Sequence, residues 1–151
     1  MRVTPENISK LEQGYIFVFG SNLSGRHGKG AAKTALGWGA KWGQAAGLQG
    51  RTYGIPTKDA SIRRTLTIEE IKPFVDDFIE FAKIRKDLIF LVTEVGCGLA
   101  GLKPKDVAPL FEKASIDEFY IDLTGMDKYF GSYKWATELR QKIIAETKLP
   151  I

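Results

Sequence analysis

The chain has a single cysteine, Cys97, and a single histidine, His27, among its 151 residues. One cysteine excludes an internal disulfide. One cysteine and one histidine together are too few for a metal site built from several cysteines or histidines. We therefore expect no metal ion and no cofactor. The lack of disulfides also fits a reducing compartment.

Long apolar runs are absent as well. No stretch approaches the roughly 18 apolar residues that a membrane-spanning helix needs. The first ten residues, MRVTPENISK, lack the basic and then apolar order of a secretion signal. We expect a soluble, cytoplasmic protein with no membrane partner.

Neither sign of charge is in large excess, since 22 lysines and arginines face 18 acidic residues for a net charge of +4. This balance favours anionic partners only mildly and is well below that of a dedicated nucleic-acid-binding chain. With 44% hydrophobic and 26% charged residues, the composition is globular. The length predicts one domain spanning residues 1–151.

Apolar runs and helical periodicities alternate along the chain. The predicted strands are residues 15–19 (YIFVF), 52–55, 88–92 (LIFLV) and 119–123, and the predicted helices are residues 28–42, 67–83, 104–113 and 133–145. Thr67 and Glu70 have the spacing of a helix capping box. The two fully apolar runs are typical of strands covered on both faces. This alternation predicts an α/β domain with a mostly parallel or mixed sheet between helix layers.

Each of the two fully apolar strands leads into a glycine-rich stretch. The first reads GSNLSGRHGKGAA, and the second, residues 96–101, reads GCGLAG. Glycine lets backbone N–H groups approach phosphate oxygens closely, and α/β folds bind ligands where loops leave the carboxyl ends of strands. A phosphate-containing ligand is therefore predicted, with tight structural turns as the alternative. Neither stretch matches the P-loop or Rossmann fingerprint.

The order of the motifs GSN, HGKGAA, RTYGIPT and LVTEVGCGLAGLKPKDV resembles the macrodomain superfamily, in particular its terminal ADP-ribose-protein glycohydrolase branch. This resemblance covers residues 15–123. It implies a three-layer α/β/α fold with a mixed central sheet, and it implies binding of ADP-ribose or a related nucleotide. The implied binding residues are Ser21, Asn22, Gly28, Lys29, Gly30, Ala31, Gly96, Cys97, Gly98, Leu99, Ala100 and Gly101.

The resemblance leaves the activity open. Ala100 stands where the glycohydrolase branch carries a catalytic aspartate. Hydrolysis of an ADP-ribosyl bond and binding without catalysis are therefore both retained. The implied partners are ADP-ribose or a related nucleotide, and an ADP-ribosylated protein or nucleic acid.

Four residues are weighed for a catalytic role, and each has a structural alternative. His27 is either a general acid or base or a loop residue. Asn22 either orients a ribose or water or closes an Asx-type turn. Glu94 is either a base or a partner of nearby backbone N–H groups. Cys97 is either a nucleophile paired with His27 or a small residue that permits close backbone approach.

A second functional hypothesis is a basic nucleic-acid-binding domain. It predicts binding that salt weakens steeply, that surface lysines and arginines carry, and that is indifferent to the glycine stretches. Trp38 and Trp42 are four residues apart and would share one helical face. Core packing is favoured over base stacking for this pair.

Overall fold

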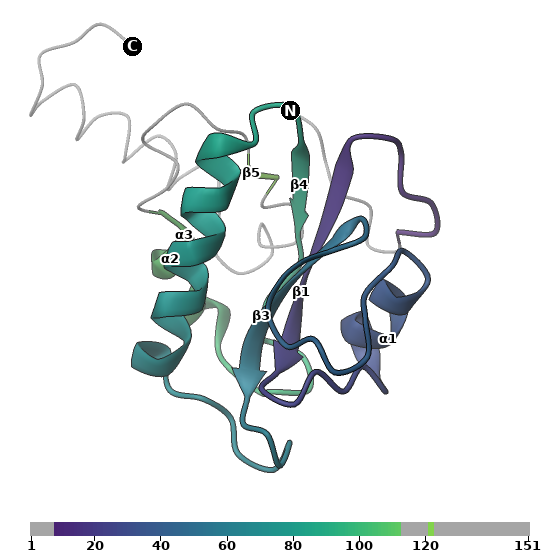
Figure 1. The fold of residues 1–151 in the computed structure, drawn as a ribbon. Coiled ribbons are helices and arrows are strands. Elements are labelled where there is room, and N and C mark those ends of the chain that lie inside the picture. The colour runs from purple at the N-terminus through teal and green to yellow at the C-terminus, as the bar shows by residue number, and fades with distance from the viewer. Residues whose placement is uncertain (1–7, 113–120, 123–151) are drawn as a thin grey trace, which may run out of the picture.

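The structure is a computed structural model that describes residues 8–112 and 121–122. The predicted helix at 133–145 and most of the predicted strand at 119–123 lie outside the described residues. The elements, drawn in Figure 1, are β1 (Tyr15–Asn22), α1 (Gly30–Leu36), β2 (Gly47–Gln49), β3 (Thr52–Lys58), α2 (Ile68–Ile84), β4 (Ile89–Val92), α3 (Pro104–Glu112) and β5 (Ile121–Asp122).

The strands form one five-stranded sheet in the order β2-β3-β1-β4-β5. β1 pairs in parallel with β3 and β4, β4 pairs in parallel with β5, and β2 is antiparallel to β3. The sheet is therefore mixed, which confirms the predicted α/β class. Because β1, β3 and β4 are parallel neighbours, their carboxyl ends meet at one edge of the sheet.

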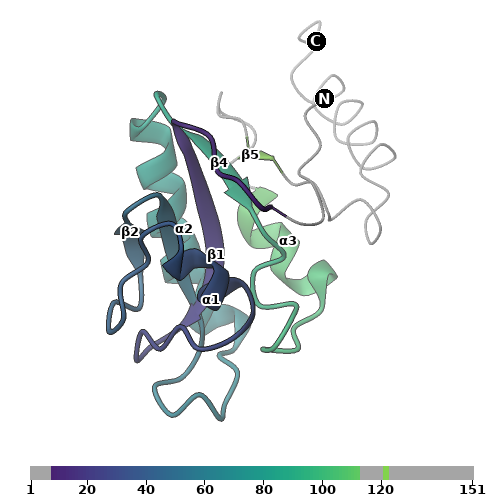
Figure 2. The same cartoon turned by 90° about the vertical axis from the view of Figure 1, so that its right-hand side faces the viewer.

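The central strand β1 is buried on both faces, as its unbroken apolar sequence predicts. Ile16 and Val18 belong to the core cluster that packs under α2 and α3, and Phe17 and Phe19 belong to the cluster under α1. This split follows the two-residue alternation of a strand. Figures 1 and 2 show α1 on one face of the sheet and α2 and α3 on the other. The domain thus has helix, sheet and helix layers.

The helix α2 begins where its capping signal predicts. The Thr67 hydroxyl accepts a hydrogen bond from the Glu70 backbone N–H at 3.2 Å, and the Glu70 carboxylate accepts one from the Thr67 N–H at 2.8 Å. These two bonds satisfy backbone donors that a helix N-terminus leaves unpaired. Among the described residues, no helix has both the length and the apolar character needed to cross a membrane.

The helix α1 is shorter than its predicted span of residues 28–42. It ends at Leu36, and the chain then turns through Gly37 and Gly39. Gly39 has a φ of +103°, and a Cβ at this position would lie 2.9 Å from the Cα of Gly50. The backbone must therefore pass closely over the β2–β3 turn at this point, which a helix cannot do. Trp42 consequently lies outside the helix.

Candidate functional site

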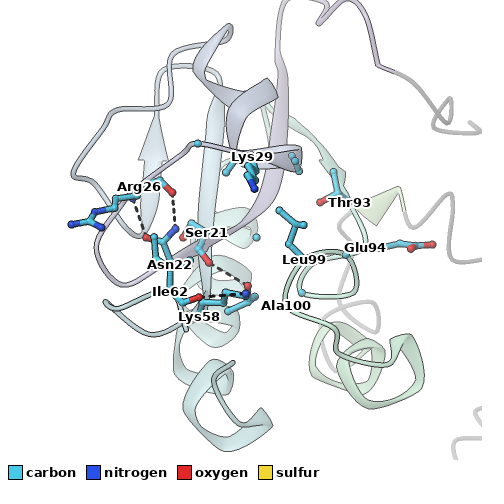
Figure 3. A pocket seen from close by; sticks show the side chains of 18 of the residues that line it. Ser21, Asn22, Arg26, Lys29, Lys58, Ile62, Thr93, Glu94, Leu99 and Ala100 are labelled. Carbon is cyan, nitrogen blue, oxygen red and sulfur yellow. Dashed lines mark hydrogen bonds between the residues drawn. The ribbon is translucent and has the colours of Figure 1, made fainter. Parts of the chain in front are cut away.

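A cavity of about 860 Å³ opens at the carboxyl edge of β1, β3 and β4 (Figure 3). Its walls come from the end of β1, the start of α1, the end of β3 and the loop after β4. Both glycine-rich stretches therefore contribute to one cavity. The sequence-predicted residues that line it are Ser21, Asn22, Gly28, Lys29, Gly30, Ala31, Glu94, Gly96, Gly98, Leu99 and Ala100. His27, Cys97 and Gly101 are not among the lining residues.

The two glycine-rich stretches meet across the cavity. A Cβ added at Gly20 would lie 3.1 Å from the backbone nitrogen of Gly96. A Cβ at Gly30 would lie 3.2 Å from Cδ1 of Leu99. Glycine at these positions allows a separation that a side chain would widen. The carboxyl ends of β1 and β4 thus form one continuous surface.

Several backbone N–H groups around this cavity have no hydrogen-bond partner among the described residues. They belong to Gly28 and Lys29 in the first stretch and to Gly98, Leu99 and Ala100 in the second. Two other N–H groups of the second stretch are paired, because Cys97 donates to the Glu94 carbonyl and Gly101 donates to the Gly98 carbonyl, each at 3.0 Å. Unpaired N–H groups gathered in a concave surface are suited to binding an anion.

The side-chain charges around the cavity are mainly positive. Among the described residues, Arg26, Lys29 and Lys58 line it together with one carboxylate, Glu94. Figure 3 shows the Arg26 side chain at the rim and the Glu94 side chain directed away from Lys29. None of the ion pairs within the described residues engages these three cations. Their charge therefore remains available to an anionic ligand.

Asn22 closes the turn that shapes the first glycine-rich stretch. Its side-chain oxygen accepts a hydrogen bond from the Arg26 N–H at 2.9 Å, and its Nδ2 donates to the Arg26 carbonyl at 2.6 Å. Both ends of the amide are thus used within the protein, which matches the Asx-type alternative. The neighbouring Ser21 hydroxyl donates to the carbonyl of Ala45. The side chains of Asn22 and Ser21 therefore hold the backbone of the cavity wall in place.

His27 is fully buried behind that wall, with 0% of its surface exposed. Its ring packs edge-on against Phe19 at 5.3 Å and faces Trp42 at 6.4 Å between centroids. Nε2 lies 3.0 Å from the Lys41 carbonyl oxygen, and Nδ1 has no hydrogen-bond partner. The position gives His27 a packing role, because no ligand in the cavity can reach the ring. The sequence places His27 in a loop but does not reveal its depth.

Cys97 packs against the core. Its thiol donates to the Val95 carbonyl at 3.6 Å. Burial, assisted by the negative charges of Glu94 and Asp106, raises the pKa of the Cys97 thiol to about 11. The reactive thiolate is therefore scarce at neutral pH. The bonded partners of Cys97 and His27 are separate carbonyl groups, so the structure contains no Cys–His pair.

Sequence reasoning missed Trp42 as a site residue. Trp42 lines the cavity, and 64% of its surface is exposed. Trp38, by contrast, packs edge-on against Phe17 with 5.0 Å between ring centroids. The shared helical face on which the two tryptophans were paired does not exist, because α1 ends at Leu36. Gly37 and Gly39 are the sequence signal for that ending.

The loop of residues 59–65 forms another part of the wall. Ile62 lines the cavity with a φ of +65°, an unusual conformation for a β-branched residue. The Asp59 carboxylate holds this loop by accepting hydrogen bonds from Ser61 and from the Arg64 N–H. The Ser61 hydroxyl in particular lowers the pKa of Asp59. The Thr65 hydroxyl donates to the Ala100 carbonyl at 2.6 Å, which joins the loop to the second glycine-rich stretch.

The fold and the cavity define an α/β protein with a largely cationic cavity at the carboxyl edge of its sheet. Residues 58–151, more than half of the chain, match the family model described as IMS, impB/mucB/samB. The chain belongs to the impB/mucB/samB family. No curated protein and no solved structure matches the chain. The matched segment begins at Lys58 and includes the second glycine-rich stretch, whereas the first precedes it.

Family membership overturns the macrodomain resemblance. Three expectations that followed from this resemblance are therefore wrong as well: ADP-ribose or a nucleotide diphosphate as the ligand, ADP-ribosylated partners, and ADP-ribosyl hydrolysis. That expectation depended on short glycine motifs at strand ends. Glycines at strand ends let the backbone approach an anion in any fold, so unrelated proteins share such motifs.

Proposed function

We propose that this chain binds DNA through contacts between its cavity and the phosphate backbone. The family supports a nucleic-acid partner, because impB/mucB/samB proteins are DNA polymerases of translesion synthesis. One structural observation carries the proposal: backbone N–H groups without a partner among the described residues, and cations that none of the described ion pairs engages, surround the same cavity. The proposal adopts the nucleic-acid-binding alternative and adds the glycine-rich stretches to its binding surface.

Backbone N–H groups and basic side chains play complementary parts in such a site. The N–H groups of Gly28 and Gly98 are short-range donors that can bond to individual phosphate oxygens. Lys29 and Lys58 add charge that acts over a longer distance and displaces counterions from the DNA. Contacts of this kind position a strand and carry no base sequence information. The proposed binding is therefore independent of sequence.

Polymerases of DNA commonly use two divalent cations, about 3.5–4 Å apart, held by carboxylates. Glu94 is the one carboxylate that lines the cavity, and its side chain points away from Lys29. Within residues 8–112 and 121–122, no group of three or more His, Cys, Asp or Glu side chains is arranged to hold a metal ion. The described residues do not fit such a cation pair. The proposed function is therefore DNA binding, with no transfer step assigned to this cavity.

The salt dependence of binding tests the proposal. Fluorescence anisotropy of a labelled thymidine oligonucleotide would give log K against log salt, with an expected slope of about −1.4 to −2 for two or three phosphate contacts. Lys29→Gln should weaken binding and make the slope shallower by about 0.7. Lys86→Gln is the matched control, because it removes the same charge from an exposed position at the opposite edge of the sheet.

Two results would reject the proposal. One is the absence of oligonucleotide binding to the folded wild-type chain at low salt. The other is an equal loss of affinity in Lys29→Gln and Lys86→Gln, because binding would then reflect total charge and not the cavity.

A further inference from the structure

We infer that the DNA bound at this cavity is single-stranded, and that the ring of Trp42 stacks on one of its bases. This inference depends on the proposed phosphate contacts and adds the class of nucleic acid. Trp42 lines the cavity that carries Lys29 and the unpaired N–H groups, and it leaves 64% of its surface in water. The cavity thus places an aromatic ring, positive charge and anion donors around one space.

The backbone that carries Trp42 is held firmly on its N-terminal side. The Lys41 N–H donates to the side-chain oxygen of Gln49 at 2.7 Å, and Gln49 is 1% exposed. The Lys41 carbonyl lies 3.0 Å from Nε2 of the buried His27. The His27 ring also contacts the Trp42 ring edge-on. Buried polar groups therefore fix both the residue before Trp42 and one side of its ring.

The C-terminal side of Trp42 is held as well. The Gly43 N–H donates to the Gly25 carbonyl at 2.9 Å. Gly25 approaches so closely that a Cβ there would lie 2.4 Å from the Gly43 carbonyl carbon. Trp42 is thus an exposed ring on a backbone fixed at both ends. A preorganised aromatic ring loses little conformational entropy when a flat ligand stacks on it.

Trp42 differs from other strongly exposed apolar residues in where it lies, and this location indicates a ligand. Ile84 is more exposed, at 78%, but it lies at the end of α2 and does not line the cavity. Leu99, at 66%, does line the cavity and offers a second apolar surface beside Gly30. The exposed side chains of Trp42 and Leu99 therefore lie at the same cavity as the proposed phosphate-binding groups.

Single-stranded DNA has the chemistry that fits this combination. Proteins that bind single strands combine a positively charged groove with aromatic side chains on which bases stack. A duplex keeps the faces of its bases stacked on one another, so it offers none to Trp42. A free phosphate or an abasic strand would use the cations and N–H groups but not the ring.

Three probes of equal phosphate content separate base stacking from phosphate binding. They are a thymidine oligonucleotide, an abasic oligonucleotide of the same length, and a duplex of half that length. The wild-type chain should bind the thymidine strand about 5- to 150-fold more tightly than the abasic strand, the range expected for stacking of one base. Trp42→Ala should abolish this ratio, and Trp42→Tyr should keep most of it. Ile84→Ala, which removes an exposed apolar side chain away from the cavity, should leave the ratio unchanged.

The outcomes distinguish this inference from the proposed function. Equal affinity of the wild-type chain for thymidine and abasic strands overturns the stacking of Trp42 and leaves phosphate binding standing. Binding of neither strand overturns both. Retention of the full ratio in a folded Trp42→Ala chain also overturns the inference. Preference for the duplex would contradict the single-stranded class directly.

Discussion

At the scale of single residues, two glycines of the first stretch, Gly25 and Gly28, have different roles. Gly25 has a φ of +65°, and its missing side chain lets the backbone at Gly43 pass within van der Waals contact. Gly28 has nothing within 4 Å of the place that a Cβ would occupy, and it lines the cavity. Gly25 is therefore required by the fold, whereas Gly28 keeps the cavity surface open.

This difference predicts opposite outcomes for two similar substitutions. Gly25→Ala should lower the free energy of unfolding by about 2 to 4 kcal/mol, because it combines a left-handed backbone with a backbone collision. Gly28→Ala should stay within about 0.5 kcal/mol of the wild-type value. Chemical denaturation of both variants measures the contrast. Equal stability of the two would show that the close approach of Gly25 to Gly43 is absent in solution.

The sequence indicated that the glycine-rich stretches lie at one edge of the sheet, but it did not reveal the aromatic ring beside them. Strand ends and glycine spacing are local features, so Gly28 and Gly98 could be placed at one edge from the sequence. The burial of His27 and the exposure of Trp42 depend on how the chain turns after Leu36. That turn depends on a tertiary contact between Gly39 and Gly50, which no local pattern contains.

At the scale of elements, α2 is specified most completely by its own sequence. Its N-terminus carries the Thr67–Glu70 capping box, and Arg64 adds a salt bridge to Glu70 at 2.7 Å. The Arg64 guanidinium and the Thr67 N–H together lower the pKa of Glu70 to about 2. Since this folded-state pKa lies below the usual value, the contribution of Glu70 to stability is present above about pH 4.5 and declines as the pH falls toward 2.

Removal of the cap should therefore destabilise the domain measurably. Thr67→Ala should cost about 0.5–2 kcal/mol, because it leaves the Glu70 N–H without its acceptor. Thr67→Ser keeps the hydroxyl and should cost much less. Thermal unfolding of the two variants at neutral pH provides the comparison. If Thr67→Ala and Thr67→Ser unfold at the same temperature, the hydroxyl has no capping role.

The strands were predicted with less success at the edges of the sheet than at its centre. β1 and β4 are apolar runs and were anticipated, but the three-residue strand β2 reads in sequence as a loop between Gly47 and Gly50. β3 continues through Pro56 to Lys58, beside a register shift of the β1–β3 ladder between Ser21 and Asn22. A proline offers no N–H to a ladder, so its placement in a strand depends on the partner strand.

At the scale of the whole molecule, the parallel arrangement of β1, β3 and β4 creates the site. Residues 20–32 and residues 93–100 are far apart in sequence, and the strand order brings them to one edge. The family match begins at Lys58, so the cavity combines residues from the matched segment with residues that precede it. We propose that this shared edge holds DNA phosphates.

Phosphate binding at this edge can be detected by nuclear magnetic resonance of the ¹⁵N-labelled chain, titrated with a short thymidine oligonucleotide. The backbone N–H groups of Gly28, Lys29, Gly98 and Leu99 are unpaired among the described residues, so a bound phosphate should shift their signals more than those of the solvent-facing side of α2. The largest shifts are expected at both glycine-rich stretches together, and smaller ones after Lys29→Gln. Binding that shifts the signals of α2 and leaves these glycines unchanged would contradict it.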